Sequence, residues 1–284
     1  MKVIGRLTLN RKKDESIQST LTSLEIESSI YEDLEFIELP IDDPRYISLK
    51  QEMTKKGVSI AETKRMEFDS EEIETAEYLR MAPKAQWGFP QPEDDFDYLN
   101  ESYDLSSGCL KCRQGRRQNR PFLLKGMPKF GRNDIIALFW VYEFIITEKL
   151  RNLIEKENLT GADFYPVRRY RKSAPRIPLP GIYQLHVAND LPPMSPKTKF
   201  EFVTDLPKNI ESCGCNIAGK NLPAAQMVYD RISLKNAKDF NRTSEFIGGG
   251  AYPTQKIIIT NMVFQLFKKN KIRGVDFIPV LIED

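Results

Sequence analysis

The sequence predicts an α+β protein built from two regions of different composition. Three observations support this: an internal repeat that relates residues 146–167 to residues 259–280, two cysteine pairs about a hundred residues apart, and a reversal of charge along the chain. We therefore expect an N-terminal α/β region at residues 1–105. A C-terminal α+β region at residues 106–284 would contain two β-α-β repeats and a zinc site at the cysteine turns.

The composition is that of a globular protein. Of the 284 residues 40% are hydrophobic and 29% are charged, so the chain resembles neither a disordered nor a membrane protein. No apolar run approaches the ~20 residues that a membrane-spanning helix needs, and the N-terminus lacks the apolar segment of a secretory signal. We expect a cytoplasmic protein that does not enter a membrane and keeps its thiols reduced.

Charge changes sign along the chain. Residues 1–108 contain 13 Lys and Arg against 24 Asp and Glu, whereas residues 109–284 contain 29 against 16. The reversal falls at the first cysteine pair, which indicates two regions with different surfaces.

The acidic region contains patterns typical of both strands and helices. Alternating apolar residues predict strands at residues 1–10 and 34–39, and a helix is predicted over Tyr46 to Lys56, before Gly57. An acidic cap before apolar residues at helical spacing predicts a second helix from Glu71 to about Met81. A Pro-rich, aromatic stretch follows at residues 83–103, and we interpret it as an ordered arm.

The C-terminal region contains the repeat. An apolar, β-prone run predicts one buried strand over Leu138 to Ile146. Each copy of the repeat then reads as a strand, a helix that starts at threonine, a glycine turn and a strand that ends at proline. The shared motif is G-x-x-F-x-P-V, which begins at Gly161 in the first copy and at Gly274 in the second. Two copies are too few for a solenoid, so we expect a duplicated module.

The four cysteines suggest a structural metal. Cys109 and Cys112 have C-x2-C spacing, and Cys213 and Cys215 form a shorter C-x-C pair. Two pairs from separate loops can complete the tetrahedron that zinc prefers, and four thiolates leave no open position for catalysis. The alternative is two pairs of buried or incidental thiols.

The sequence offers no recognisable catalytic set. His186 is the only histidine and lies in a strand-like stretch, so we interpret it as an ordinary strand residue. No zinc-protease, nucleophile-elbow or kinase motif is present. We therefore expect a protein that is not an enzyme.

Two charged segments are candidate binding surfaces. Trp87, Glu93, Asp94, Asp95 and Asp97 belong to an acidic, aromatic stretch that could dock a basic partner; the alternative is an ordinary linker. Residues 111–132 contain basic side chains and no acidic one, so they could contact phosphates; the alternative is a solvated face. The nearly balanced total charge makes a dedicated nucleic-acid binder the less favoured interpretation.

Several of these features together resemble a known group of bacterial proteins. A C-x2-C turn at Cys109 and Cys112 is followed by Gln118 to Lys125, then by a strand, a helix and the motif at 161–167. The chain is similar over residues 60–284 to the double-CxxCG paralogous family of myxobacteria and to related immunity proteins of polymorphic toxin systems. Arg113 and Asn216 stand where that family has glycine after each cysteine pair.

The resemblance implies a non-catalytic cytoplasmic protein that binds and neutralises a cognate toxin. The alternative is a zinc-containing nucleic-acid-binding or regulatory protein that uses the basic segment at 111–132.

Overall fold

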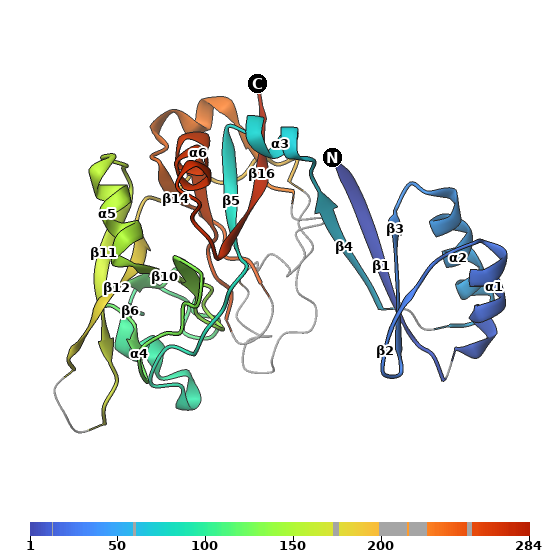
Figure 1. Cartoon of the computed structure of the whole chain (residues 1–284), viewed down its shortest axis with the longest axis horizontal. Helices are drawn as coiled ribbons and strands as arrows, with labels where there is room; N and C mark the ends of the chain where they lie inside the picture. Colours follow the sequence, from blue (N-terminus) through green and yellow to red (C-terminus); the bar gives the residue numbers. More distant parts are fainter. Residues whose placement is uncertain (13, 59–60, 173–175, 199–214, 216–225, 249–251) are drawn as a thin grey trace. The chain divides into compact units, whose positions relative to one another are not determined.

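The computed structural model describes the chain except for residues 13, 59–60, 173–175, 199–214, 216–225 and 249–251 (Figure 1). It confirms the predicted α+β fold class, with several β-sheets and short helices. The chain forms two compact units: one contains Met1–Ser70, and the other contains most of the chain from Glu71 to Asp284. The division therefore falls at Ser70, before the charge reversal, and residues 71–105 belong to the C-terminal unit. They do so because their strand at Tyr78–Pro83 pairs with the last strand of the chain.

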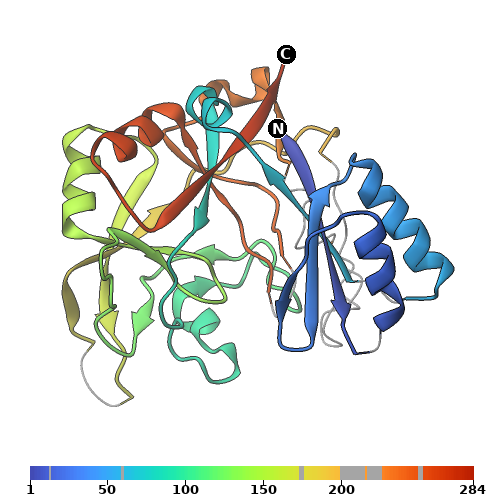
Figure 2. The same ribbon diagram turned by 45° about the vertical axis from the view of Figure 1, so that its right-hand side comes forward.

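The N-terminal unit is a four-stranded antiparallel sheet with the order β2-β3-β1-β4. Its helices α1 and α2 lie on the same face of the sheet (Figure 2). Leu7, Ile37, Leu49 and Met53 are fully buried between the sheet and these helices. The elements are β1 Lys2–Asn10, η1 Glu15–Ile17, α1 Gln18–Ser23, β2 Ser29–Tyr31, β3 Leu34–Pro40, α2 Pro44–Lys55 and β4 Ala61–Glu67.

Sequence signals account for most of this unit. The strands predicted at residues 1–10 and 34–39 are confirmed as β1 and β3, and the helix predicted over Tyr46 to Lys56 is confirmed as α2. Helix α2 begins at Pro44 because the Asp43 carboxylate caps it, accepting a hydrogen bond of 2.8 Å from the Arg45 backbone NH.

The C-terminal unit contains two five-stranded sheets. Sheet I has the order β8-β11-β12-β10-β9, and sheet II has the order β13-β16-β5-β15-β14. The first elements are α3 Ser70–Thr75, β5 Tyr78–Pro83, η2 Asp94–Phe96, α4 Tyr98–Ser102, β6 Tyr103–Asp104, β7 Arg117–Gln118, β8 Leu123–Leu124, β9 Ile135–Ala137, β10 Phe144–Thr147, α5 Glu148–Lys156, β11 Ala162–Arg169 and β12 Pro178–Val187. The others are β13 Val228–Asp230, η4 Arg231–Asn236, β14 Phe240–Arg242, β15 Ile257–Thr260, α6 Asn261–Lys269 and β16 Val275–Glu283.

The two sheets have the same internal pairing. In sheet I, β8 is parallel to β11, β12 is antiparallel to both β11 and β10, and β9 is antiparallel to β10. In sheet II, β13, β16, β5, β15 and β14 pair with the same directions in the same order. The segments that the sequence relates by a shift of 113 residues thus form strand, helix and strand in both sheets, and a third strand separates the two strands of each segment.

The separating strands, β12 in sheet I and β5 in sheet II, are exchanged between the first and second halves of the C-terminal unit. In chain order, the strands of the two sheets and helices α5 and α6 form two series: β5, β8, β9, β10, α5, β11 and then β12, β13, β14, β15, α6, β16. The first strand of each series completes the sheet of the other series: β5 lies between β15 and β16, and β12 lies between β10 and β11. The chain therefore enters sheet II before it builds sheet I.

One hydrophobic core joins the two sheets. Figures 1 and 2 show α5 and α6 side by side, and the cluster they cover takes buried side chains from both sheets and both helices. Its members include Leu79, Ile146, Ile154, Leu185, Ile259 and Phe267. A second cluster packs on sheet I and is rich in aromatic residues; Tyr98, Phe122, Ile136, Ile145 and Val167 belong to it.

The two glycines of the repeated motif lie where the sheets approach each other. Gly161 has φ +86° and an added Cβ would lie 2.2 Å from the carbonyl oxygen of Phe240 in β14. Gly274 has φ +108° and an added Cβ would lie 1.8 Å from the carbonyl oxygen of Ile135 in β9. Each half therefore places its glycine against the edge strand of the other half, where only glycine fits without displacement.

Three sequence predictions are wrong. The helix expected from Glu71 to Met81 ends at Thr75, and β5 follows it, because Leu79 and Met81 are buried in the sheet and pair with β15 and β16. The strand expected over Leu138 to Ile146 is a tight turn followed by the start of β10, since β9 ends at Ala137 and β10 begins at Phe144. The strands expected to end at the proline of each repeat continue beyond Pro166 to Arg169 in β11 and beyond Pro279 to Glu283 in β16. In each case tertiary pairing overrides the local pattern.

Candidate metal centre

The first cysteine pair lies in a loop closed by a two-stranded ladder. Strands β6 and β7 pair Tyr103 with Gln118, so residues 105–116 form the loop between them. Inside it the Cys109 backbone NH donates to the Gln114 carbonyl at 2.8 Å, and the Arg113 NH donates to the Cys109 carbonyl at 2.8 Å. These bonds fix the turn on which both cysteines are carried.

Three of the four predicted ligands lie together. The Sγ atoms of Cys109, Cys112 and Cys215 are all within 4.8 Å of one another, although Cys215 is about a hundred residues away in sequence. In a tetrahedral zinc site, Zn–S bonds of about 2.3 Å place the sulfur atoms about 3.8 Å apart, so the spacing suits a metal ion. Cys213, the fourth predicted ligand, lies outside the described residues.

The turn is shaped for thiolates. Arg113, which follows the second cysteine, has φ +59°, the conformation in which glycine is ordinarily favoured at that place. Hydrogen bonding from the backbone NH of Cys112, and to a lesser degree from that of Lys111, lowers the pKa of the Cys109 thiol to about 7. A thiol so placed is deprotonated at lower cost when a metal binds.

A buried arginine anchors the end of this loop. The Arg116 side chain is only 6% exposed, and it donates from Nη1 to the Arg113 carbonyl at 3.1 Å and from Nη2 to the Pro253 carbonyl at 2.8 Å. Its guanidinium carbon lies 5.0 Å from the ring centroid of Tyr103 and 5.5 Å from that of Phe246. The cysteine loop is thereby joined to the segment between β14 and β15.

The predicted partner-binding residues do not form one uniform group. Trp87 is half-buried against the aromatic core cluster, and Glu93 forms an ion pair with Lys125 and accepts a hydrogen bond from Gln91 at 3.0 Å. Asp94, Asp95 and Asp97 are exposed, on and next to the short η2 helix.

The sequence did not reveal the aromatic surface beside these acids. In the turn between β9 and β10, Phe139 is 37% exposed, Trp140 is 38% exposed and Tyr142 is 45% exposed. The Trp140 ring lies 4.8 Å from the Phe96 ring and 4.5 Å from the Phe89 ring. The turn contains no glycine, proline or asparagine, so no local signal marked it.

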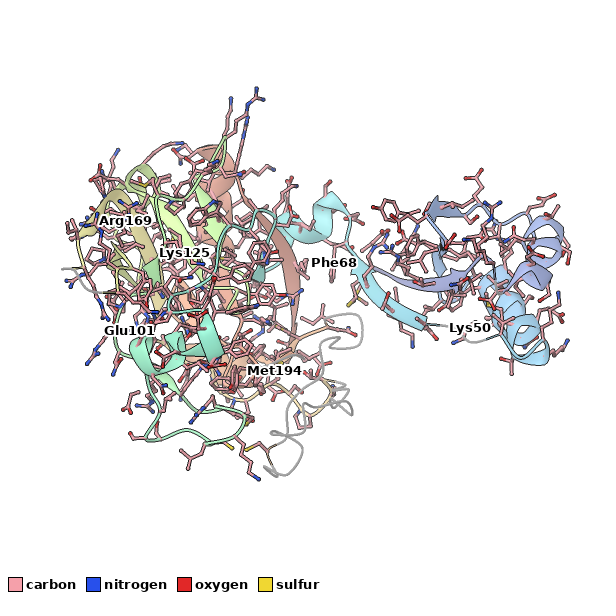
Figure 3. All side chains as sticks on the ribbon, turned by 90° about the horizontal axis from the view of Figure 1, so that it is seen from below. Lys50, Phe68, Glu101, Lys125, Arg169 and Met194 are labelled. Atoms are coloured by element: carbon pink, nitrogen blue, oxygen red, sulfur yellow. The ribbon has the colours of Figure 1, made fainter. Side chains whose placement is uncertain are left out.

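The basic segment does not form one continuous exposed face. Arg116 is buried, Lys125 pairs with Glu93, and Arg120 lies 4.0 Å from Glu101. Figure 3 shows Lys125 near Arg169, whose Nε donates to the Lys125 carbonyl at 3.4 Å. The exposed cations of the segment are Lys111, Arg117, Arg120, Lys125, Lys129 and Arg132.

His186 lies in β12, as expected of a strand residue, and is buried. Its ring stacks on Tyr165 with 4.5 Å between centroids. Burial, reinforced by the positive charge of Arg242, lowers the pKa of the imidazole to about 4. The ring is therefore neutral near pH 7.

A scan against models of protein families finds no match, and neither does a search of curated proteins. Within the described residues, no helix has both the length and the apolar character needed to cross a membrane. What the structure establishes is a cluster of three cysteine thiols, two on one turn and the third from Cys215, close enough together to hold a metal ion.

Proposed function

We propose that this chain is a non-catalytic protein that binds and neutralises a cognate bacterial toxin, and that a structural zinc ion holds its cysteine loop in place. We infer a toxin as the partner from the resemblance to immunity proteins of polymorphic toxin systems. Zinc is the metal that best fits an all-thiolate ligand set. Cys213, two residues from Cys215, would supply the fourth thiolate and close the site to substrate.

The observation that supports a binding role is an exposed surface next to the acidic arm. We define the aromatic–acidic surface as Phe96, Phe139, Trp140, Asp94, Asp95 and Asp97. Phe139 and Trp140 are each more than one-third exposed, and three carboxylates lie beside Phe96, which contacts Trp140. Exposed aromatic residues that are already held by neighbouring rings lose little side-chain entropy when a partner covers them.

Backbone strain is concentrated at the same surface. Three residues of the surface, Asp95, Phe96 and Trp140, and the neighbouring Tyr142 have φ between +50° and +67°, a region that non-glycine residues rarely occupy. Strain of this kind costs about 1–3 kcal/mol per residue and collects at binding sites, where side-chain placement matters more than local stability. This supports selection for binding at the surface.

The chemistry of the surface indicates a basic partner. Among the described residues, Asp94 and Asp95 have no ion pair, and the Asp97 carboxylate accepts one hydrogen bond, from Asn100 Nδ2 at 2.8 Å. These carboxylates can steer and pair with Lys or Arg side chains on the partner. Nucleic-acid binding through residues 111–132 has less support, because Arg116 is buried and Lys125 is paired with Glu93.

The test is direct binding to a purified toxin encoded beside the gene. Titration calorimetry should detect a complex whose affinity falls at least about thirtyfold in Trp140→Asn, since a buried aromatic hot spot contributes roughly 2 kcal/mol or more. Asparagine tolerates positive φ, so this variant should stay folded. The control is Tyr31→Asn, which removes an aromatic residue that is 68% exposed in the N-terminal unit. Absence of binding, or equal affinity for Trp140→Asn and the native chain, would refute the proposal.

A further inference from the structure

A cavity of about 420 Å³ lies beside the cysteine loop in the C-terminal unit. It is lined by the end of the loop and strand β7, by the end of β12 and by the chain from β14 towards β15; its residues include Arg116, Arg117, His186, Arg242 and Gln255. Its volume falls within the range of about 300–1,000 Å³ typical of small-molecule sites. The function proposed above makes no use of it.

The lining is strongly cationic. Among the described residues it contains three guanidinium groups and one carboxylate, that of Asp190, which accepts a hydrogen bond of 3.0 Å from Gln255 Nε2. Arg242 is 8% exposed and its Nη2 donates to the Glu143 carboxylate at 2.8 Å, so its charge is compensated. Arg117 is exposed at the rim.

Arg116 is the unusual member. It is almost fully buried, yet its hydrogen-bond partners are two carbonyl groups, and no carboxylate pairs with it among the described residues. Taking a charge out of water costs several kcal/mol unless an opposite charge accompanies it. Two aromatic faces offset part of that cost, and an anion in the adjoining cavity would offset more.

His186 adds a neutral polar group to the wall. Its Nδ1 is buried and has no hydrogen-bond partner in the described structure. The negative charge of Asp163 raises the pKa of the imidazole and the positive charge of Arg242 lowers it, and the effect of Arg242 is the larger. A ligand oxygen in the cavity would change the surroundings of this imidazole directly.

We propose that the cavity binds a small molecule through a phosphate or carboxylate group held by Arg116 and Arg117. Guanidinium groups bind both oxyanions through paired, charge-assisted hydrogen bonds. Gln255 and His186 supply further polar contacts, and Arg242, already paired with Glu143, adds positive potential. The volume exceeds that of an isolated phosphate, so the ligand carries further atoms beyond its anionic group.

The single histidine makes the test specific. In a ¹H–¹³C spectrum of the full chain, the ring signals of His186 report on the cavity without ambiguity, because the sequence contains one histidine. Inorganic phosphate, pyrophosphate and citrate are titrated separately at constant ionic strength set with sodium chloride. We expect a saturable shift of the His186 signals, and the ranking of the three probes separates phosphate from carboxylate recognition.

Variants connect the shift to the cavity. Arg117→Gln should weaken binding about tenfold, the effect of one lost charge-assisted contact. Arg132→Gln, which removes the same charge from an exposed residue outside the cavity, should leave it unchanged. No saturable shift with any probe, or equal loss in both variants, would overturn the proposal. A thermal-unfolding check of each variant separates loss of binding from loss of fold.

Discussion

Replacing Gly274 with alanine tests whether the two halves of the C-terminal unit are in close contact at this residue. The added Cβ would lie 1.8 Å from the Ile135 carbonyl oxygen and 3.0 Å from the Cβ of Asn133. The nearer atom belongs to the backbone of an edge strand, so it cannot rotate away. Either the turn before β16 or strand β9 must move.

The expected cost has two parts. Placing alanine at φ +108° costs about 1–2 kcal/mol, and forcing a methyl group into a packed site costs typically 1–3 kcal/mol more. The sum, about 2–5 kcal/mol, is a large fraction of the roughly 5–15 kcal/mol that stabilises a typical domain. Gly161→Ala should behave similarly, since its Cβ would lie 2.2 Å from the Phe240 carbonyl oxygen.

Gly181 provides the matched control. It has φ +70°, and an added Cβ would meet no atom within 4 Å, so Gly181→Ala carries the conformational cost without the collision. Urea unfolding followed by tryptophan fluorescence is a suitable assay, because both tryptophans, Trp87 and Trp140, belong to the C-terminal unit. If Gly274→Ala is destabilised no more than Gly181→Ala, the two halves do not approach each other closely at Gly274.

Three further predictions concern buried polar groups and the cysteine cluster. His186 has a pKa of about 4 in the folded protein, below its unfolded value of about 6.5. Because the unfolded state therefore binds the extra proton, the free energy of unfolding falls by about 3 kcal/mol as the pH drops from 6.5 towards 4. This loss should be smaller in His186→Gln, and equal acid sensitivity of the two proteins would contradict the prediction. Glu143→Gln leaves Arg242 buried without its countercharge and should lower the free energy of unfolding by about 3–5 kcal/mol. The double variant with Arg242→Gln should recover part of this loss, whereas additive effects in the double-mutant cycle would show that the two residues are not coupled. Elemental analysis should find about one zinc per native chain and much less in Cys112→Ser, whereas a native stoichiometry near zero would exclude the zinc centre.

Features marked by residues with one specific structural use could be predicted from the sequence. The repeat was visible because threonine, glycine and proline recur at fixed spacing in both copies, and each marks a helix start, a turn or a strand. The meeting of Cys215 with the first cysteine pair could be predicted because cysteines cluster for few other reasons.

Features that depend on tertiary pairing could not be predicted. Tyr78 to Met81 have spacing compatible with a helix, and only their pairing with two distant strands makes them β5. The turn that exposes Trp140 contains none of the residues that usually mark turns. The cationic cavity takes its walls from three separate segments, and Arg116 looked like one more surface cation until its burial was known.

The exchange of β5 and β12 constrains how the chain can fold during synthesis. Strand β5 emerges from the ribosome early, yet Leu79 pairs with Ile259 and Pro279, so its neighbours are made last. Proteins usually fold from the N-terminus as synthesis proceeds, but here neither sheet of the C-terminal unit can be completed in isolation by its own half. A separately expressed half would have to take its missing central strand from a second copy. The intact chain therefore has the architecture of a strand-swapped dimer joined into a single polypeptide.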